Sequence, residues 1–356
     1  MITRRERVHE LRAKADTLAG LLVDHVRATS MFDVAELARD PLGALTDSNV
    51  MTVAYVDPWQ LPIGCSIAAC LDRGCVPPRA LVSADASVRR RGFSALHELG
   101  HVLRNLVPEV VRALFAEPDR GRALEEVTCD AFAAAVLLPR SSTDKIFVEG
   151  VTARSVVEMF HASSASRMAC CVAAARYLPS SGLVMLCRPI ANGADAEGLL
   201  VAAFTAPHGD ALPVARDVPQ DADVLARGWQ IGKARGQGQP KYRSGNHGRE
   251  LLVDVVRDDE HALAVWMEHS PAWGGLTLPP RQGPAGVEGY CGNCDHSFHT
   301  FAGSCAACGS PLCPSCGQCD CAEEYRPTRG QRSCQRCFQV LPASAFDDDG
   351  EVCNQH

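Results

Sequence analysis

The residues best suited to chemistry in this sequence form one short motif, His97-Glu98-Leu99-Gly100-His101. On a helix, side chains four positions apart lie on one face, so both imidazoles can reach the same cation. We expect this cation to be zinc, because imidazole nitrogens bind it at about 2.0–2.1 Å. The carboxylate of Glu98, next to the first histidine, can approach a water activated by the metal and act as general base.

A catalytic zinc site needs a third protein ligand and an open position. The metzincin continuation is excluded, because Arg104 and Val107 stand where that motif requires Gly and His. On a following helix, Glu126 precedes Asp130 by one turn, so both project to one side. We predict that Glu126 binds zinc and that Asp130 accepts the second ring N–H of a zinc-bound histidine. The alternative is that Glu125 and these two residues are only an acidic first turn that complements the helix dipole.

Two blocks of the sequence resemble the ImmA/IrrE family of zinc metallopeptidases, namely residues 91–101 (RGFSALHELGH) and 126–139 (EVTCDAFAAAVLLP). Both blocks match the family's paired helices in order and spacing, although Asp130 stands where the family often has Asn. The resemblance covers about residues 1–180 and implies the same three ligands and the same base. Because family members typically cleave a repressor or another transcription regulator, it also implies a protein substrate.

The second concentration of metal-binding residues is a cysteine-rich tail, which holds eleven of the 18 cysteines. Together with His356 these make twelve ligands at zinc-knuckle spacings, enough for three structural zinc ions. The predicted ligands are Cys291, Cys294, Cys305, Cys308, Cys313, Cys316, Cys319, Cys321, Cys334, Cys337, Cys353 and His356. With the catalytic ion, we expect about four Zn²⁺ per chain.

The pairing of these tail ligands stays open at the level of sequence. A sequential pairing makes one site from each successive group of four ligands. The middle group, however, is crowded into residues 313–321, which also favours a cross-braced exchange between the first two groups. Residues 286–356 carry nine acidic side chains and four arginines, a net charge of -5, which disfavours contact with nucleic acid and favours a protein partner.

The composition of the whole chain is that of a globular protein. Of its 356 residues, 46% are hydrophobic and 22% are charged, so the chain can bury a core. The net charge of -7 gives no general attraction for phosphate backbones. No apolar run of about 18 residues is present, which predicts no membrane span. The charged start of the chain fits no signal peptide, so we expect a cytoplasmic protein with reduced cysteines.

The elements that must position the motif are predicted to form an α+β fold. Residues 3–29 show helical periodicity, residues 50–56 and 79–83 resemble strands, and helical patterns dominate residues 86–138. We therefore expect a mainly helical, zincin-like metallopeptidase domain with a small sheet over residues 1–145. We also expect the strand at residues 79–83 to bind an extended substrate along its edge.

Four further segments are expected after this domain. Residues 146–180 form a helix pair with helix-turn-helix-like spacing, for which packing is favoured over DNA binding. Residues 181–278 form a β-rich segment that resembles a sensor domain only by analogy, with a solvated loop at residues 232–248. Residues 279–289 are a linker, and residues 290–356 are the zinc-ribbon region.

The function predicted from the sequence is that of a zinc-dependent endopeptidase. Its expected substrate is a transcriptional repressor or an antitoxin-like regulator, in a stress, defence or mobile-element response. The alternative is a non-catalytic, zinc-containing transcription regulator or interaction scaffold. No oxyanion-stabilising residue is assigned: His161 and Tyr177 are near enough in sequence, but packing roles are favoured for both.

Overall fold

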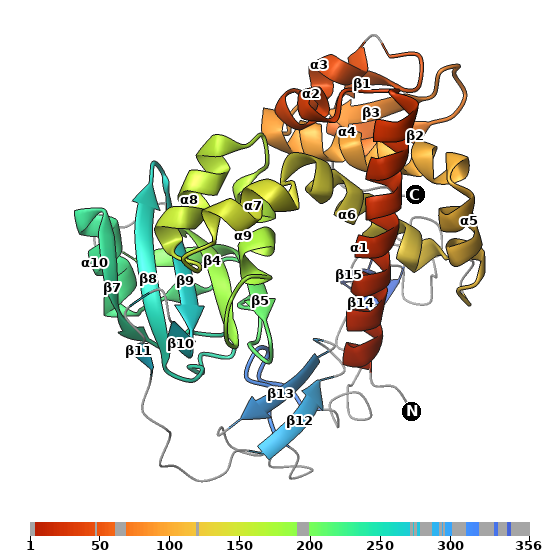
Figure 1. Cartoon of the computed structure of the whole chain (residues 1–356). Helices are drawn as coiled ribbons and strands as arrows, with labels where there is room; N and C mark the ends of the chain where they lie inside the picture. Colours follow the sequence, from red (N-terminus) through yellow and green to blue (C-terminus); the bar gives the residue numbers. More distant parts are fainter. Residues whose placement is uncertain are drawn as a thin grey trace. The chain divides into compact units, whose positions relative to one another are not determined.

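A computed structural model describes residues 4–46, 48–60, 69–118, 121–190, 199–270, 273, 276–277, 287–291, 294, 296–300, 311–319, 331–333 and 340–342. The chain divides into two compact units, residues 1–283 and residues 284–356. The fold class is α+β, as predicted. Figure 1 shows the helices and strands of both units.

The first unit begins with helices and a small sheet and continues with a larger sheet (Figure 1). Its helices are α1 (Arg4–Thr29), α2 (Val34–Arg39), α3 (Pro41–Thr46), α4 (Val88–Leu103), α5 (Pro108–Phe115), α6 (Arg122–Leu137), α7 (Arg140–Ile146), α8 (Ala153–Ala162), α9 (Arg167–Ala175) and α10 (Asp223–Ile231), with 3-10 turns η1 (Pro58–Gln60) and η2 (Arg104–Leu106). Its strands are β1 (Thr52–Val56), β2 (Ala69–Asp72), β3 (Arg79–Ser83), β4 (Gly182–Pro189), β5 (Leu200–His208), β6 (Pro219–Gln220), β7 (Lys233–Gly238), β8 (Leu251–Asp258), β9 (His261–Met267), β10 (His269–Ser270) and β11 (Leu276–Thr277).

The small sheet has the strand order β1-β3-β2. Strand β3 runs parallel to β1, from Thr52 opposite Arg79 to Val56 opposite Ser83, and antiparallel to β2. The expectation that residues 79–83 offer an edge to a substrate is therefore wrong, because β3 has a partner on both sides. Within the described residues, the outer strands of this sheet are β1 and β2.

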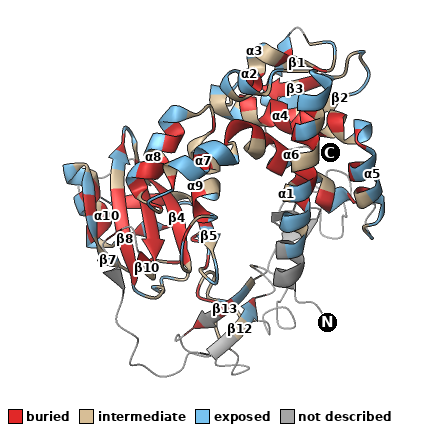
Figure 2. Ribbon diagram, in the orientation of Figure 1, coloured by how far each residue is buried: buried red, intermediate tan, exposed pale blue. Residues whose placement is uncertain are grey.

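The motif helix α4 lies against α6, and α1 covers α6 in turn. Leu96, Leu99 and Leu103 on one side of α4 are fully buried, as the apolar positions of its sequence predict. The ribbon in Figure 2, coloured by burial, shows buried residues along both α4 and α6. The two helices approach closely at Gly100, where an added Cβ would lie 3.1–3.2 Å from atoms of Cys129. This close approach brings the side chains of α6 up to the motif.

The larger sheet is antiparallel, with the strand order β6-β5-β4-β9-β8-β7. Strand β7 pairs along its whole length with β8, so residues 233–238 are not the solvated loop that their Gly, Lys and Arg content predicted. A close approach between β7 and α10 explains the glycine, because an added Cβ at Gly236 would lie 3.3 Å from Val224 Cγ2. Helices α8 and α9 pack on strands of the same sheet.

The second unit contains two described hairpins, β12 (Val287–Cys291) with β13 (His296–Thr300), and β14 (Gln331–Ser333) with β15 (Val340–Pro342). In the first hairpin, Cys291 lies opposite His296 where the strands approach their connection. Phe298 and Cys313 are buried in this unit. Few apolar side chains are buried among the described residues of this unit, so a further source of stability, such as a metal, is expected there.

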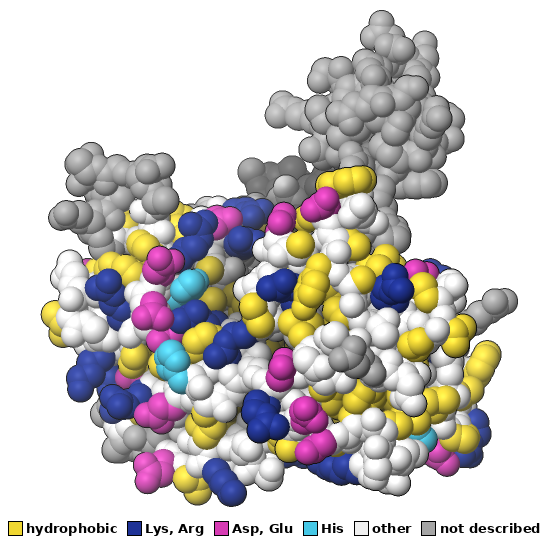
Figure 3. All heavy atoms as spheres, turned by 90° about the horizontal axis from the view of Figure 1, so that it is seen from above, with side chains coloured by type: hydrophobic (Ala, Val, Ile, Leu, Met, Phe, Trp, Pro, Cys, Tyr) yellow, Lys and Arg dark blue, Asp and Glu magenta, His cyan; other side chains and the backbone are white. Residues whose placement is uncertain are grey.

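Charged side chains of both signs are interspersed on the face seen in Figure 3, with no continuous basic surface among its described residues. Arg167 begins helix α9, the second of the predicted pair, and Arg176 is the C-cap of this helix. Both make ion pairs within the chain, Arg167 with Asp258 and Arg176 with Asp16. None of the described helices has the length and apolar character needed to cross a membrane.

Candidate metal centre

Helix α4 carries the His-Glu-x-x-His motif on a buried segment. The helix begins at an N-cap, Ser87, whose hydroxyl accepts a hydrogen bond from the Arg90 N–H. His97 and Glu98 are 5% and 4% exposed, so their polar groups lie inside the fold rather than on its surface. Buried ionisable groups need partners, and the neighbouring helix α6 supplies them for the histidines.

Three potential ligands converge here, from two elements. The ligand atoms of His97, His101 and Glu126 all lie within 4.8 Å of one another. His97 Nε2 is 3.1 Å from His101 Nε2, and the Glu126 oxygens are 3.4 Å and 3.7 Å from these two nitrogens. Two ligands of one tetrahedral zinc are about 3.3 Å apart, as follows from bond lengths of about 2.0–2.1 Å. The donor set and its spacing therefore fit zinc.

Each histidine has a carboxylate on its other ring nitrogen. Asp130 Oδ1 lies 2.8 Å from His97 Nδ1, and Glu125 Oε1 lies 2.7 Å from His101 Nδ1. Donation from Nδ1–H to a carboxylate leaves the Nε2 lone pair for a cation. A contact between Asp130 and a motif histidine was predicted from the sequence, whereas Glu125 was interpreted only as part of an acidic first turn. Its position directly before Glu126 was the available signal.

The electrostatics of the pocket favour positive charge. Burial opposes protonation of His97, but hydrogen bonds to Asp130 and Glu126 outweigh it and raise the pKa of His97 to about 10. For Glu126, the hydrogen bond from His97 is the main cause of a lowered pKa. Burial raises the pKa of the Glu98 carboxyl, against the opposing effect of the two histidines. A cation bound between the histidines meets the same attraction from the surrounding carboxylates.

The tail contains a second cluster, made by two Cys-x-x-Cys pairs. The sulfurs of Cys291, Cys294, Cys313 and Cys316 lie within 4.8 Å of one another, and those of Cys291 and Cys316 are 3.6 Å apart. This grouping joins the first and third pairs of the tail, which is the cross-braced arrangement rather than the sequential one. Four sulfur ligands at this spacing are typical of a structural zinc site.

Hydrogen bonds already stabilise sulfur as an acceptor in this cluster. The Cys294 N–H donates to Cys291 Sγ at 3.3 Å. Burial raises the pKa of Cys291 to about 11, whereas at Cys316 hydrogen bonds from the Gln318 N–H and neighbouring thiols outweigh burial and lower the pKa to about 7. Cys319 is described but does not belong to this group of four. The predicted ligands Cys305, Cys308, Cys321, Cys334, Cys337, Cys353 and His356 lie outside the described residues.

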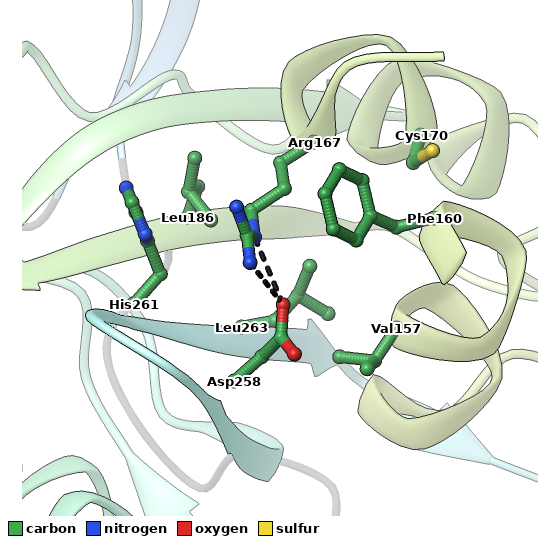
Figure 4. Close-up of a pocket in the computed structure, with 8 residues that line it drawn as sticks. All are labelled: Val157, Phe160, Arg167, Cys170, Leu186, Asp258, His261 and Leu263. Atoms are coloured by element: carbon green, nitrogen blue, oxygen red, sulfur yellow. Dashed lines mark hydrogen bonds and ion pairs between the residues drawn. The ribbon is translucent and has the colours of Figure 1, made fainter. Parts of the chain in front are cut away.

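Two residues considered as oxyanion donors have partners of their own. His161 Nε2 lies 2.8 Å from Asp258 Oδ1, and the Tyr177 hydroxyl donates to Asp144 Oδ1 at 2.6 Å. Asp258 also accepts two hydrogen bonds from Arg167, in the pocket between α8, α9 and the large sheet (Figure 4). Both polar groups are therefore hydrogen-bonded to carboxylates of this chain.

No curated protein was found to match the sequence. A solved structure of a Mycobacterium tuberculosis transcriptional regulator resembles the chain at 12% identity with a TM-score of 0.39, covering 73% of this chain and 76% of that one. Residues 68–165 match the family model Peptidase_M78, described as an IrrE N-terminal-like domain. The matched segment contains both the motif helix α4 and helix α6, so the similarity to the IrrE N-terminal-like domain covers the elements that carry the candidate metal centre.

Proposed function

We propose that this protein is a zinc-dependent endopeptidase that cleaves another regulatory protein. The observation that carries the proposal is the convergence of His97, His101 and Glu126 around one point, with Glu98 on the same helix. Three protein ligands leave a fourth position for water or substrate, which distinguishes a catalytic zinc from a structural one. The Peptidase_M78 match over the same residues supports this reading.

In this proposal, the two Nε2 atoms and the Glu126 carboxylate would hold the zinc, and Asp130 and Glu125 orient the rings through Nδ1. When bound, zinc acts as a Lewis acid that acidifies water and polarises a peptide carbonyl. Burial is important for the rest of the site, because charges act more strongly where water is excluded.

Glu98 is the proposed general base and acid. Its carboxylate takes a proton from the attacking water as the water oxygen bonds to the scissile carbonyl carbon. The same carboxyl then delivers the proton to the departing amide nitrogen, whose bond to carbon breaks. One water and one peptide bond are consumed, and a carboxylic acid and an amine are formed. A buried carboxyl with a raised pKa is suited to both transfers.

For the substrate, we propose a folded regulator with a locally extended segment, such as a repressor or antitoxin-like protein in a stress, defence or mobile-element response. The family resemblance supports a protein substrate. Such a segment would form backbone hydrogen bonds with β1 or β2, which are the outer strands of the small sheet among the described residues. Strand β2 leads directly to Arg73, whose positive charge acts on Glu98.

For the tail, we propose a structural zinc site at Cys291, Cys294, Cys313 and Cys316. The sulfur spacing supports it, and the acidic tail composition favours protein recognition over nucleic acid. The remaining tail ligands stay predictions, as does the total of about four zinc ions per chain.

The variant Glu98→Gln tests the enzymatic proposal. The purified chain is incubated with a helix-turn-helix regulator encoded beside it, and cleavage is followed by mass spectrometry. We expect the variant to keep its zinc and lose cleavage by about 10²–10⁴-fold, because amide cannot accept the proton. Glu109→Gln on the exposed face of α5 is the matched control. Equal cleavage by native and Glu98→Gln chains would support a non-catalytic regulator instead.

A further inference from the structure

A charged residue beyond the motif also contacts the candidate metal centre through Glu125. Glu125 Oε1 lies 2.7 Å from His101 Nδ1 and 2.6 Å from Arg104 Nε. The same carboxylate oxygen therefore faces a predicted metal ligand on one side and a guanidinium on the other. Arg104 Nε makes no hydrogen bond, so its contact with Glu125 is an ion pair.

The positions of these residues follow from two helices. Arg104 comes one turn after His101 and is the C-cap of α4, and Glu125 lies in the first turn of α6, directly before Glu126. Helix α4 thus supplies two ligand side chains and, at its C-cap, Arg104, and helix α6 supplies one ligand side chain and Glu125. A substitution of Arg104 or Glu125 therefore changes the contact between α4 and α6 beside the candidate metal centre.

Burial separates this contact from an ordinary surface salt bridge. The Glu125 side chain is 17% exposed and that of Arg104 is 25% exposed, whereas the Asp130 carboxylate beside His97 is 60% exposed. Exposed ion pairs are screened by water and contribute little. A mostly buried carboxylate needs a compensating charge, and Arg104 supplies it. His97 therefore contacts the exposed carboxylate of Asp130. His101 contacts the mostly buried carboxylate of Glu125, whose charge is compensated by Arg104.

We propose that Glu125 and Arg104 are positioning residues for His101. Glu125 accepts the Nδ1 hydrogen, which fixes the tautomer with Nε2 directed at the metal, and Arg104 holds the Glu125 carboxylate in place. This inference rests on the proposed function, because it assigns a role toward the same metal centre. Neither residue touches the reacting atoms, so both act on zinc affinity and on ring orientation.

Zinc affinity tests the inference without reference to activity. The full chain is titrated against a competing zinc-binding dye, and the His101→Ala chain gives the contribution of the tail. We expect Glu125→Gln and Arg104→Gln each to weaken the His97–His101–Glu126 site by about 10–100-fold. Glu125→Asp, which keeps the charge but shortens the reach, should weaken it similarly. Arg104→Lys should retain more affinity than Arg104→Gln, because the contact is an ion pair.

A matched exposed pair and a double variant complete the test. Glu109→Gln and Arg112→Gln remove an exposed ion pair on α5 and should leave zinc affinity unchanged. If Arg104 acts only through Glu125, the double variant Glu125→Gln, Arg104→Gln should lose no more affinity than Glu125→Gln alone. Melting temperatures of the zinc-stripped native and variant chains show whether a loss of zinc affinity comes from unfolding. A variant that is unfolded without zinc would count against a positioning role.

The outcomes separate this inference from the proposed function. Native affinity in Glu125→Gln and Glu125→Asp, with a zinc ion still lost in His101→Ala, overturns the positioning role alone. Fully additive losses in the double variant overturn the link between Arg104 and Glu125. Equal zinc content in native and His101→Ala chains overturns the metal centre itself, and this inference with it.

Discussion

At the scale of single residues, the two histidines of α4 present the same ring nitrogen to one point. This follows because each Nδ1 is engaged by a carboxylate of α6, Asp130 for His97 and Glu125 for His101. The carboxylates therefore select the tautomer as well as the direction of each ring. Glu126 differs from both, since its oxygens face the Nε2 atoms. Its removal should act on the metal directly.

Glu126→Gln is expected to remove one zinc ion per chain, because a neutral amide is a poorer ligand than the carboxylate it replaces. Metal analysis by mass spectrometry after dialysis measures the loss. Glu158→Gln, which changes an exposed glutamate of α8, is the matched control and should keep the full zinc content. Unchanged zinc in Glu126→Gln would show that this carboxylate is not a ligand.

The motif itself could be predicted at this scale because helical periodicity alone places His97 and His101 on one face. The spacing of Glu126 and Asp130 likewise predicted that both project to one side. Periodicity does not show which residue of another helix each ring nitrogen meets. The Glu125 contact to His101 depends on how α4 and α6 are packed, so it emerged only from the structure.

At the scale of elements, the site depends on the distance between α4 and α6. Gly100 sets this distance, because its missing side chain lets Cys129 approach the α4 backbone. The apolar positions of α4 predicted a buried side for that helix, and Leu96, Leu99 and Leu103 are buried. The sequence was less informative for β7, because glycines and basic residues such as those around Gly236 are typical of a loop. The structure shows a strand there, and the glycine allows the close approach of α10.

Gly100→Ala should destabilise the fold by about 1–3 kcal/mol, since the added methyl meets Cys129 at 3.1–3.2 Å and overpacks the interface. It should also weaken zinc binding, because Glu126 moves with α6. Chemical denaturation and zinc titration measure the two effects. Gly20→Ala in α1 is the control: no atom lies within 4 Å of its added Cβ. Helix propensity should stabilise that variant by about 0.5–1 kcal/mol.

The junction of α8 and α9 with the large sheet provides a pH-dependent contribution to stability. Although burial raises the pKa of Asp258, hydrogen bonds from His161 and Arg167 outweigh it and lower this pKa below its ordinary value of 3.8. A carboxyl with a depressed pKa in the folded state contributes stability above its unfolded pKa. The contribution is lost as pH falls through the folded pKa. The charged and titratable groups around it are His161 of α8, Arg167 of α9, Asp259 and Glu260 of the β8–β9 turn, and His261 of β9.

Asp258→Asn should therefore cost about 1.5–3 kcal/mol of unfolding free energy at pH 7, because hydrogen bonds to a charged group are lost. The difference between native and variant chains should shrink as pH falls below about 4. Urea denaturation of both chains at a series of pH values measures this difference in unfolding free energy. Titration of the neighbouring groups, which both chains share, largely cancels in the difference. A difference that stays constant down to the acid transition would contradict this reading.

At the scale of the whole molecule, the two units obtain their stability from different sources. The unit of residues 1–283 has a continuous apolar core that extends from Ala15 in α1 to Met267 in β9 and beyond. In the unit of residues 284–356, the described residues show few buried apolar side chains and a group of four cysteines. Sequence spacing predicted metal ligands there but not their pairing, because proximity between the first and third cysteine pairs depends on the fold.

Zinc removal should therefore unfold residues 284–356 and leave residues 1–283 largely folded. Limited proteolysis with a strong chelator should yield a resistant fragment that ends near residue 283, identified by its mass. Chelator already saturated with zinc is the control and should leave the tail as resistant as in the untreated chain. Cys313→Ser should reproduce the chelator's effect on the tail without affecting zinc at the His97–His101–Glu126 centre, since the ligands of the two clusters are distinct. Equal resistance of the tail with and without zinc would contradict the view that metal provides its folding free energy.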